Sequence, residues 1–236
     1  MTSLFATPEE AYAAYREAPQ HFFERYHEDN FDERSLISPS WTWYETKYHY
    51  NLVENGIIDL LGGPGSGIDV GDVLDIGSGT GHWIEFYARI MEARSVTGAD
   101  FSQLASKALA ERYAGRPDLT VHQLDISQHR AEFDDSFDVI NAIGVMFHIV
   151  DDDLWRAALG HMGKYLRRDG IAIIGGDFGP NTEELGVMRR TRSLELWEDT
   201  LDALDLEVCG LELFDWAKGG INEGLKNNLL AFQHKD

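Results

Sequence analysis

Past residue 68 the chain alternates between short apolar runs and segments whose apolar residues recur every three or four positions. The runs are typical of buried strands, and the spaced segments are typical of helices with one buried face. Strands that alternate with helices in this way predict right-handed β-α-β crossovers and a mostly parallel sheet covered on both faces, which is a doubly wound α/β fold. The predicted strands are 70–76, 95–99, 119–124, 137–143 and 171–175.

The predicted helices between these strands show capping residues and one apolar face. The first is marked by Trp83, Phe86, Tyr87 and Ile90. Ser102 caps a second helix, which ends near Tyr113. A third is expected at 151–168, with inward-facing Leu154, Ala158 and Leu166. The tail predicts a helix at about 183–204 and then two strands, 207–214 and 228–234, whose short connection indicates an antiparallel edge.

The region before residue 62 has a helical pattern throughout. Thr7, Pro8 and Glu10 fit an N-cap, a first-turn proline and a capping-box acid of a helix that runs to about residue 18. A second helical stripe runs on to residue 61 and comprises Trp41, Tyr44, Tyr48 and Leu52. The glycine-rich stretch 62–67 is typical of a linker. We therefore expect an N-terminal helical cap segment at 1–61 and a second domain at 68–236.

Composition restricts the classes of partner. With 236 residues and 43% hydrophobic residues, the chain can form one ordinary α/β domain with a helical appendage. The net charge of −21 argues against binding to nucleic acid or to an anionic membrane surface, because both need clustered Lys and Arg. Cys209 is the single cysteine, so no internal disulfide forms. No signal-peptide pattern or membrane-length apolar run occurs, and we expect a cytoplasmic protein.

The acidic residues are spread along the whole chain, and only six of the 20 basic residues are lysines. A surface of this kind stays hydrated when salt is concentrated and self-repulsion is screened. We therefore hypothesise a halophilic source, with an ordinary acidic protein as the alternative. Unfolding measured from low to molar KCl tests this, and no gain in stability would contradict it.

A glycine-rich turn follows the first predicted strand. The pattern Asp-x-Gly-x-Gly-x-Gly comprises Asp75, Gly77, Gly79 and Gly81, and it differs from the Gly-x-Gly-x-x-Gly of dinucleotide binders. Bare backbone at a strand-to-helix turn lets a ligand lie close to the main chain. Asp75 would repel a pyrophosphate but suits a sulfonium or an ammonium group. Alternatively, Asp75 is only a hydrogen-bond acceptor that orders the turn.

Two further acids end the next two predicted strands. Asp100 follows the second strand, where a carboxylate can accept both hydroxyls of a ribose. Asp125 follows the third, where it can accept a hydrogen bond from the exocyclic amine of a purine. Because carboxyl ends of parallel strands meet at one edge, all three acids are expected to face one crevice. The alternative for Asp100 and Asp125 is a solvated strand end.

In this order the segments resemble the motifs of the class I S-adenosylmethionine-dependent methyltransferases. The resemblance covers about 70–178, with motifs at 75–81, 96–102, 122–126, 137–143 and 166–174. It implies a Rossmann-like seven-stranded sheet with an antiparallel last strand, and S-adenosylmethionine as cofactor. It also implies these positions: the glycine turn with Ser78 under the methionine part, Asp100 at the ribose, Asp125 and Ile126 at the adenine, and Asn141 or Ala142 beneath the sulfonium. Phe101 is either part of the core or a neighbour of the adenine.

No catalytic residue follows from the sequence. His148 is placed after the fourth strand, where a general base could lie, but a buried structural histidine fits as well. Asp177 fits a loop role, and Tyr44 and His49 lie on the N-terminal helical segment, where they either shape an acceptor pocket or cap the core. Methyl transfer to a thiol or a neutral amine needs in-line placement more than a base.

Several chemistries are excluded by missing patterns. The nine histidines show no metal-binding pair around an acid, so we expect no metal site. The stretch 62–67 lacks the following Lys-Ser/Thr of a phosphate-binding loop. We expect methyl transfer to a small-molecule acceptor by direct displacement, without nucleic-acid or membrane partners. The alternatives are a nicotinamide-dependent oxidoreductase and a non-catalytic cofactor-binding protein that acts as a regulator or interaction partner.

Overall fold

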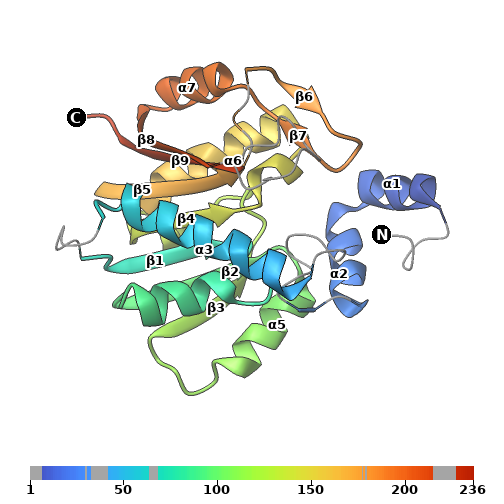
Figure 1. Ribbon diagram of the computed structural model, residues 1–236, viewed down its shortest axis with the longest axis horizontal. Helices are drawn as coiled ribbons and strands as arrows, with labels where there is room; N and C mark the ends of the chain where they lie inside the picture. Colours follow the sequence, from blue (N-terminus) through green and yellow to red (C-terminus); the bar gives the residue numbers. More distant parts are fainter. Residues whose placement is uncertain are drawn as a thin grey trace.

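A seven-stranded sheet forms the centre of the molecule in the computed structural model, which describes residues 7–29, 31–32, 42–63, 69–176, 178, 180–214 and 227–236 (Figure 1). The strand order is β3-β2-β1-β4-β5-β9-β8. The strands are β1 (Asp72–Ile76), β2 (Ser95–Asp100), β3 (Leu119–Gln123), β4 (Phe137–Ile143), β5 (Leu166–Gly176), β8 (Leu206–Phe214) and β9 (Asn227–His234). Strands β1 to β5 pair in parallel, while β9 is antiparallel to both of its neighbours. The predicted doubly wound, mostly parallel sheet with an antiparallel last strand is confirmed.

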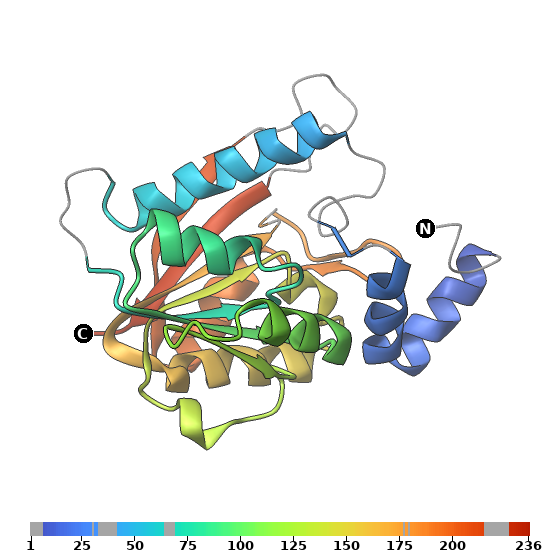
Figure 2. The ribbon, with the colours of Figure 1, turned by 90° about the horizontal axis from the view of Figure 1, so that it is seen from below.

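Helices cover both faces of this sheet, as Figure 2 shows. On one face lie α3 (Trp43–Leu60), α4 (His82–Glu85), the π-helix Phe86–Ile90 and α5 (Gln103–Arg112). On the other lie α6 (Asp152–Tyr165) and α7 (Leu194–Ala203). Successive strand residues point to opposite faces of the sheet. Val73 therefore packs in the core on the α3 side, and Leu74 packs in the core on the α6 side. This burial on both sides explains why the strands are continuous apolar runs in the sequence.

The N-terminal region contains two short helices, α1 (Pro8–Glu17) and α2 (Pro19–Asp29). The predicted cap of α1 is confirmed, since the Thr7 hydroxyl accepts a hydrogen bond from the Glu10 N–H at 3.2 Å. Helix α3 begins at Trp43 behind a capping box of Thr42 and Glu45. Trp41 and residues 64–67 of the predicted linker lie outside the described residues. The division at 62–67 stays a prediction.

The buried stripe of α3 differs from the predicted one. Tyr44 and Tyr48 are 73% and 46% exposed, while Tyr50, Val53 and Ile57 are buried against the sheet. Two inward assignments elsewhere are also wrong, because Ile90 and Leu154 are 66% and 50% exposed. Ile90 ends the π-helix Phe86–Ile90, so a spacing of three and four residues does not describe one face along that segment.

The predicted helix at 183–204 is wrong in its first half. Residues 183–191 form a small hairpin of β6 (Glu183–Glu184) and β7 (Arg190–Thr191), and α7 begins only after Ser193. The Ser193 hydroxyl caps α7 by accepting a hydrogen bond from the Leu196 N–H at 3.3 Å. Strand β5 also begins earlier than predicted, at Leu166, because α6 ends at Tyr165. The hairpin therefore lies at the carboxyl end of the sheet rather than extending α7.

Candidate functional site

The glycine turn between β1 and α4 has left-handed backbone at all three glycines, with φ of 74° at Gly77, 51° at Gly79 and 90° at Gly81. A Cβ atom at Gly77 would lie 2.3 Å from Cγ2 of Val145, in the loop after β4. The Gly77 N–H donates to the carbonyl oxygen of Ala99 at 2.7 Å, which ties the turn to β2. Backbone conformation and space thus both require glycine at Gly77.

Asp75 lies fully buried at the end of β1 beneath this turn. Its Oδ1 accepts a hydrogen bond from Nδ2 of Asn141 at 2.7 Å, while its Oδ2 has no hydrogen-bond partner among the described residues. Burial raises the pKa of Asp75 to about 7. The hydrogen bonds from Asn141 and Ser78 oppose this rise, and the negative charge of Asp100 adds to it. An unpaired buried carboxyl oxygen with a raised pKa favours a cationic partner.

The Asp75 carboxylate is held by two residues of neighbouring elements. Asn141, fully buried on β4, donates to Asp75 and accepts at its Oδ1 from the Tyr87 hydroxyl at 3.3 Å. Tyr87 comes from the π-helix, a form that is often found at functional sites. The sequence marked Tyr87 only as a helix-face residue, and no motif signals its hydroxyl contact. The prediction for Asn141 placed it at the cofactor, and the structure adds that it fixes Asp75.

Asp100 connects β2 to the glycine turn. Its Oδ2 accepts a hydrogen bond from the Gly79 N–H at 2.8 Å, and its Oδ1 accepts one from the Ser102 N–H at 2.8 Å. The side chain is 7% exposed, and burial raises the pKa of Asp100 although His27 and the two N–H donors oppose the rise. The structure therefore brings Asp75, the glycine turn and Asp100 together, as expected from the strand ends.

Asp125 ends the loop after β3 and is engaged locally. Its Oδ1 accepts from the Ser127 N–H at 2.9 Å and from the Ser127 hydroxyl at 2.6 Å, and its Oδ2 accepts from the Gln128 amide at 3.1 Å. Ile126 is buried, and its carbonyl oxygen accepts from Nδ1 of His161 at 2.8 Å. Phe101 is half-buried after β2. A carboxylate has about four lone-pair positions, so Asp125 keeps capacity for one more donor.

The three weak catalytic candidates lie in different surroundings. His148 ends the short helix η3 (Met146–His148), its Nδ1 lies 2.8 Å from the carbonyl oxygen of Met188, and burial lowers its pKa to about 4. Burial, helped by the charge of His82, also lowers the pKa of His49 to about 4. Tyr44 is largely exposed on α3. Asp177 lies outside the described residues. A histidine with so low a pKa is a weak base near neutral pH.

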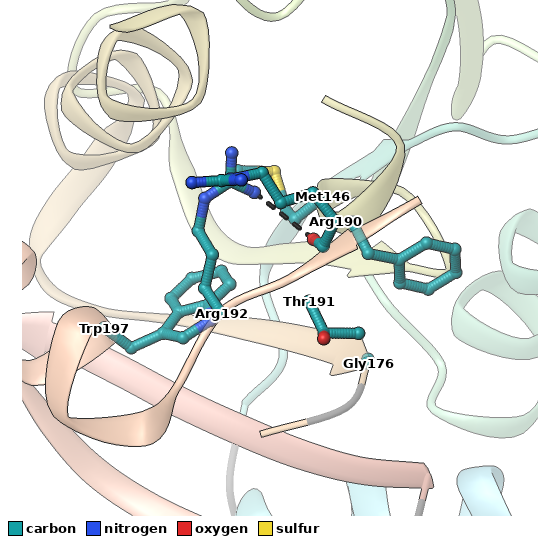
Figure 3. A pocket seen from close by; sticks show the side chains of 8 residues that line it. Met146, Gly176, Arg190, Thr191, Arg192 and Trp197 are labelled. Atoms are coloured by element: carbon teal, nitrogen blue, oxygen red, sulfur yellow. Dashed lines mark hydrogen bonds between the residues drawn. The ribbon is translucent and has the colours of Figure 1, made fainter. Parts of the chain in front are cut away.

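A narrow pocket opens at the carboxyl ends of β4 and β5, beside η3, β7 and α7 (Figure 3). It is mostly apolar, with arginine side chains on the hairpin side. The Arg189 guanidinium lies 4.7 Å from the centre of the Phe147 ring, next to this pocket. The lining residues are Met146, Phe147, Gly175, Gly176, Arg190, Thr191, Arg192 and Trp197.

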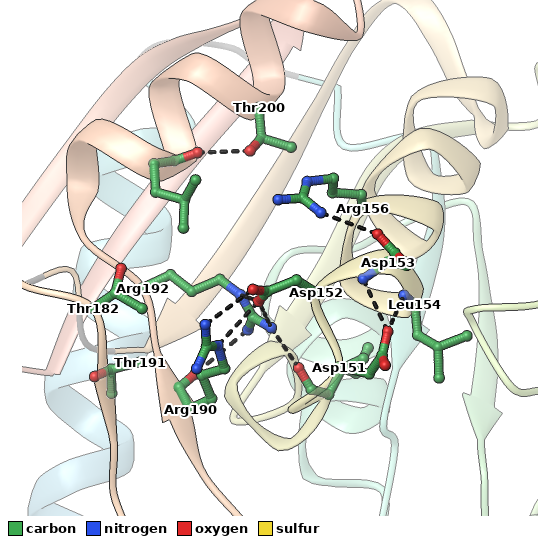
Figure 4. A network of polar contacts seen from close by, with 12 residues as sticks. Asp151, Asp152, Asp153, Leu154, Arg156, Thr182, Arg190, Thr191, Arg192 and Thr200 are labelled. Atoms are coloured by element: carbon green, nitrogen blue, oxygen red, sulfur yellow. Dashed lines mark hydrogen bonds and ion pairs between the residues drawn. The ribbon is translucent and has the colours of Figure 1, made fainter.

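Asp152 anchors the β6–β7 hairpin beside the pocket (Figure 4). Arg190 donates to both of its carboxylate oxygens, at 3.0 and 2.9 Å, and Arg192 donates to its Oδ1 at 3.0 and 2.8 Å. The Arg192 side chain is only 1% exposed, and its guanidinium lies 4.4 Å from the centre of the Trp155 ring. A single carboxylate thus neutralises a buried guanidinium and fixes one wall of the pocket.

Asp152→Ala should lower the free energy of unfolding by about 2 kcal/mol, because it leaves buried Arg192 without its counter-charge while Asp152 itself is partly exposed. Thermal unfolding of the purified variant measures this loss. Asp153→Ala is the matched control, since Asp153 is the next residue on α6 and its side chain is 94% exposed. Equal melting temperatures for the two variants would contradict the anchoring role of Asp152.

The described residues hold neither a metal-binding cluster nor a membrane-spanning helix. No group of three or more His, Cys, Asp or Glu side chains in them is arranged to hold a metal ion. Within the same residues, no helix combines the length and the apolar character needed to cross a membrane.

Comparisons with known proteins give one matching domain model and several solved structures of similar fold. Residues 73–170 match the family model described as a methyltransferase domain. The fold is similar to a 1,6-didemethyltoxoflavin-N1-methyltransferase of Burkholderia thailandensis, solved with 1,6-didemethyltoxoflavin and S-adenosylhomocysteine (TM-score 0.63, 18% identity, 100% of this chain and 94% of that one). It is also similar to an S-adenosylmethionine-dependent methyltransferase of Leishmania major (TM-score 0.70, 10% identity, 96% and 85%).

A third similar structure is the complex of the Haloferax volcanii Trm112 methyltransferase activator with a methyltransferase (TM-score 0.58, 14% identity, 80% of this chain and 92% of that one). At these identities the neighbours establish the fold. None of the curated proteins matches the chain.

The residues at the carboxyl ends of β1 and β2 fit S-adenosylmethionine. The unpaired Oδ2 of Asp75 suits a positively charged group, and the turn at Gly77 and Gly79 leaves bare backbone at the strand end. Asp100 lies against the same turn, through Gly79. These features coincide with the segment that the family model matches. Residues 73–170 thus match a methyltransferase-domain family model, and the fold of the chain is that of solved S-adenosylmethionine-dependent methyltransferases.

Proposed function

We propose that this chain is an S-adenosylmethionine-dependent methyltransferase that acts on a small molecule. The observation that carries the acceptor class is the similarity to the Burkholderia neighbour, which aligns over the whole of this chain and was solved with 1,6-didemethyltoxoflavin bound. The pocket beside η3 and the end of β5 is mostly apolar, as small-molecule sites typically are, but its volume is about 10 Å³, so it has to widen before an acceptor can enter. The net charge of −21 adds support, because it disfavours nucleic-acid acceptors.

We further propose roles for the crevice residues toward the cofactor. Asp75, Gly77, Ser78, Gly79 and Gly81 lie at the methionine part, with Asp75 facing its positive charge. Asp100 accepts the ribose hydroxyls, and Asp125, Ile126 and Phe101 lie at the adenine. Asn141 and Ala142 form the floor next to the sulfur. The hydrogen bonds that join Asp75 to Asn141 and Asp100 to Gly79 support this arrangement, since they place these groups at one edge of the sheet.

When bound, S-adenosylmethionine would supply a methyl group: a nucleophilic atom of the acceptor would bond to the methyl carbon as the carbon–sulfur bond breaks, and its electron pair would stay on the sulfur of S-adenosylhomocysteine. The protein orients the two reactants, excludes water and places carboxylates near the positive charge. His148, His49 and Tyr44 stay weak candidates for a base. Acceptors that need no base, such as a thiol or a neutral amine, agree with the low pKa of both histidines.

The alternatives are less well supported. A nicotinamide-dependent oxidoreductase shares the sheet but not the family match at 73–170. A non-catalytic cofactor-binding protein would keep the crevice without transferring the methyl group.

Label transfer separates these functions. The protein is incubated with S-adenosylmethionine carrying a labelled methyl group and, separately, with the small-molecule, protein and nucleic-acid fractions of a cell extract. We expect label in the small-molecule fraction, and none with a Gly79→Val control, whose branched side chain would lie where the cofactor is proposed to bind. Label confined to the protein or nucleic-acid fraction would overturn the proposed acceptor class. Binding of S-adenosylhomocysteine with no transfer to any fraction would favour the non-catalytic alternative.

A further inference from the structure

Glu24, on α2, caps a helix that is 78 to 80 residues away in the sequence. Its carboxylate accepts hydrogen bonds from the Gln103 N–H, from the Leu104 N–H at 3.0 Å and from the Ser102 hydroxyl at 3.0 Å, all at the start of α5. The first N–H groups of a helix have no partner inside it and are usually capped by an adjacent residue. Burial alone would raise the pKa of Glu24, but the donors at Leu104, Gln103 and Ser102 bring it below its ordinary value. Glu24 is therefore charged at neutral pH.

The contact continues from Glu24 into the crevice. Ser102, whose hydroxyl donates to Glu24, donates its N–H to Oδ1 of Asp100, and Oδ2 of Asp100 accepts from Gly79 in the glycine turn. A second residue of α2 lies on the same side. Burial lowers the pKa of His27, and the neighbouring carboxylates of Asp100 and Glu24 oppose that shift. Helix α2 is thus connected to the turn through three successive hydrogen bonds.

Helices α1 and α2 also contact the segment after β4 and the β6–β7 hairpin. The Tyr15 hydroxyl of α1 donates to the carbonyl oxygen of His148 at 2.5 Å, and the Phe23 ring packs edge-on against the His148 ring with 5.3 Å between centroids. Met188, in the turn of the β6–β7 hairpin, packs against Tyr15 and Phe22. Figure 1 and Figure 2 show α1 and α2 at the carboxyl end of the sheet, and these contacts reach both the Asp100 turn and the loop after β4.

We propose that Glu24 is a positioning residue for cofactor binding. By capping α5 it holds the 100–102 turn against Gly79, and the same contact keeps α1 and α2 seated at the crevice. Docking of α1 and α2 on the rest of the protein should then increase the affinity for the nucleoside at Asp100. By linkage, bound nucleoside should favour docking of the two helices by the same free energy. The inference rests on the proposed ribose role of Asp100. Neither α2 nor Glu24 is part of the segment that the family model matches.

The test measures S-adenosylhomocysteine binding and amide hydrogen exchange on the full chain. Glu24→Ala should weaken the affinity about tenfold, in the range of ordinary coupling between two sites. In the parent, S-adenosylhomocysteine should slow exchange in 8–29, and in Glu24→Ala this protection should disappear. Glu24→Gln, which keeps an acceptor oxygen but no charge, should lie between the two. Glu28→Ala, an exposed acid on the same helix, should stay within about twofold of the parent.

Asp100→Ala, measured in parallel, distinguishes a failure of the Glu24 coupling role from a failure of the proposed ribose site. If Asp100→Ala loses affinity while Glu24→Ala binds like the parent and keeps the ligand-induced protection of 8–29, the coupling role of Glu24 is overturned alone. If Asp100→Ala also binds like the parent, the proposed ribose site fails and the inference fails with it. Circular dichroism of each variant confirms that a loss of affinity comes from a folded protein.

Discussion

Asp75→Asn should weaken S-adenosylmethionine binding and abolish the pH dependence of that binding. In the folded, ligand-free parent the pKa of Asp75 is about 7, because burial disfavours the charged form. A cationic group beside Oδ2 favours the ionised carboxylate, so binding releases a proton below pH 7. The affinity of the parent should therefore rise by up to about tenfold per pH unit from pH 5.5 toward pH 7 and then level off. Calorimetry across this range measures both the affinity and the released proton.

Although Asp75→Asn should bind the cofactor more weakly, the ligand-free variant should be more stable than the parent at high pH. Because the folded-state pKa of Asp75 is above the unfolded value, its contribution to stability is fully present below about pH 4 and is lost as the pH rises through 7. Relative to the parent, ligand-free Asp75→Asn should gain stability of the order of 3 kcal/mol between pH 4 and pH 8. Asp59→Asn, at an exposed position on α3, is the charge-matched control. Parallel stability curves for Asp75→Asn and the parent would rule out a buried, raised-pKa carboxyl at this site.

Asp100→Ala should lower cofactor affinity by about 1.5–3 kcal/mol, which is the scale of charge-assisted hydrogen bonds. The variant removes the proposed acceptor of the ribose hydroxyls. It also leaves the N–H groups of Gly79 and Ser102 without the oxygens that they donate to at 2.8 Å. Both losses act in the same direction, so the effect belongs at the upper end of the range. Titration with S-adenosylhomocysteine, by calorimetry or thermal shift, gives the affinity.

Two further variants separate these losses. Asp100→Asn keeps one acceptor oxygen and should fall between Ala and the parent. Asp199→Ala, at an exposed position on α7, removes the same charge without touching the crevice and should leave the affinity unchanged. Parent-like titration of Asp100→Ala would move the ribose site elsewhere.

Local patterns predicted the parts of the fold that local physics determines. Strand β4 has the predicted bounds, 137–143, because a fully buried parallel strand is a continuous apolar run. The cap of α5 at Ser102 is confirmed for a similar reason, since a serine before a helical stripe caps through its own hydroxyl. The glycine turn and the acids at the ends of β1 and β2 also follow from spacing, because parallel strands end at one edge.

The missed parts depend on contacts between distant residues. The 183–191 segment was predicted as helix from its own residues, yet Arg190 pairs with Asp152, 38 residues earlier. Glu24 resembles any exposed helix acid until α5 is placed beside it. Tyr87 lies in a π-helix, and its hydroxyl donates to Oδ1 of Asn141, which is 54 residues later in the chain. Such contacts have no local signature, whereas the capping and burial patterns do.

The position of β9 has a consequence for the order of assembly during synthesis. Strands β1 to β5 pair with one another in parallel, so their half of the sheet can close once residue 176 has left the ribosome. Strand β8 pairs only with β9 in this sheet, and β9 inserts between β8 and β5. Until residues 227–234 emerge, β5 presents an open edge and β8 has no place to dock. The nascent chain therefore carries an aggregation-prone strand edge while residues 177–226 are synthesised.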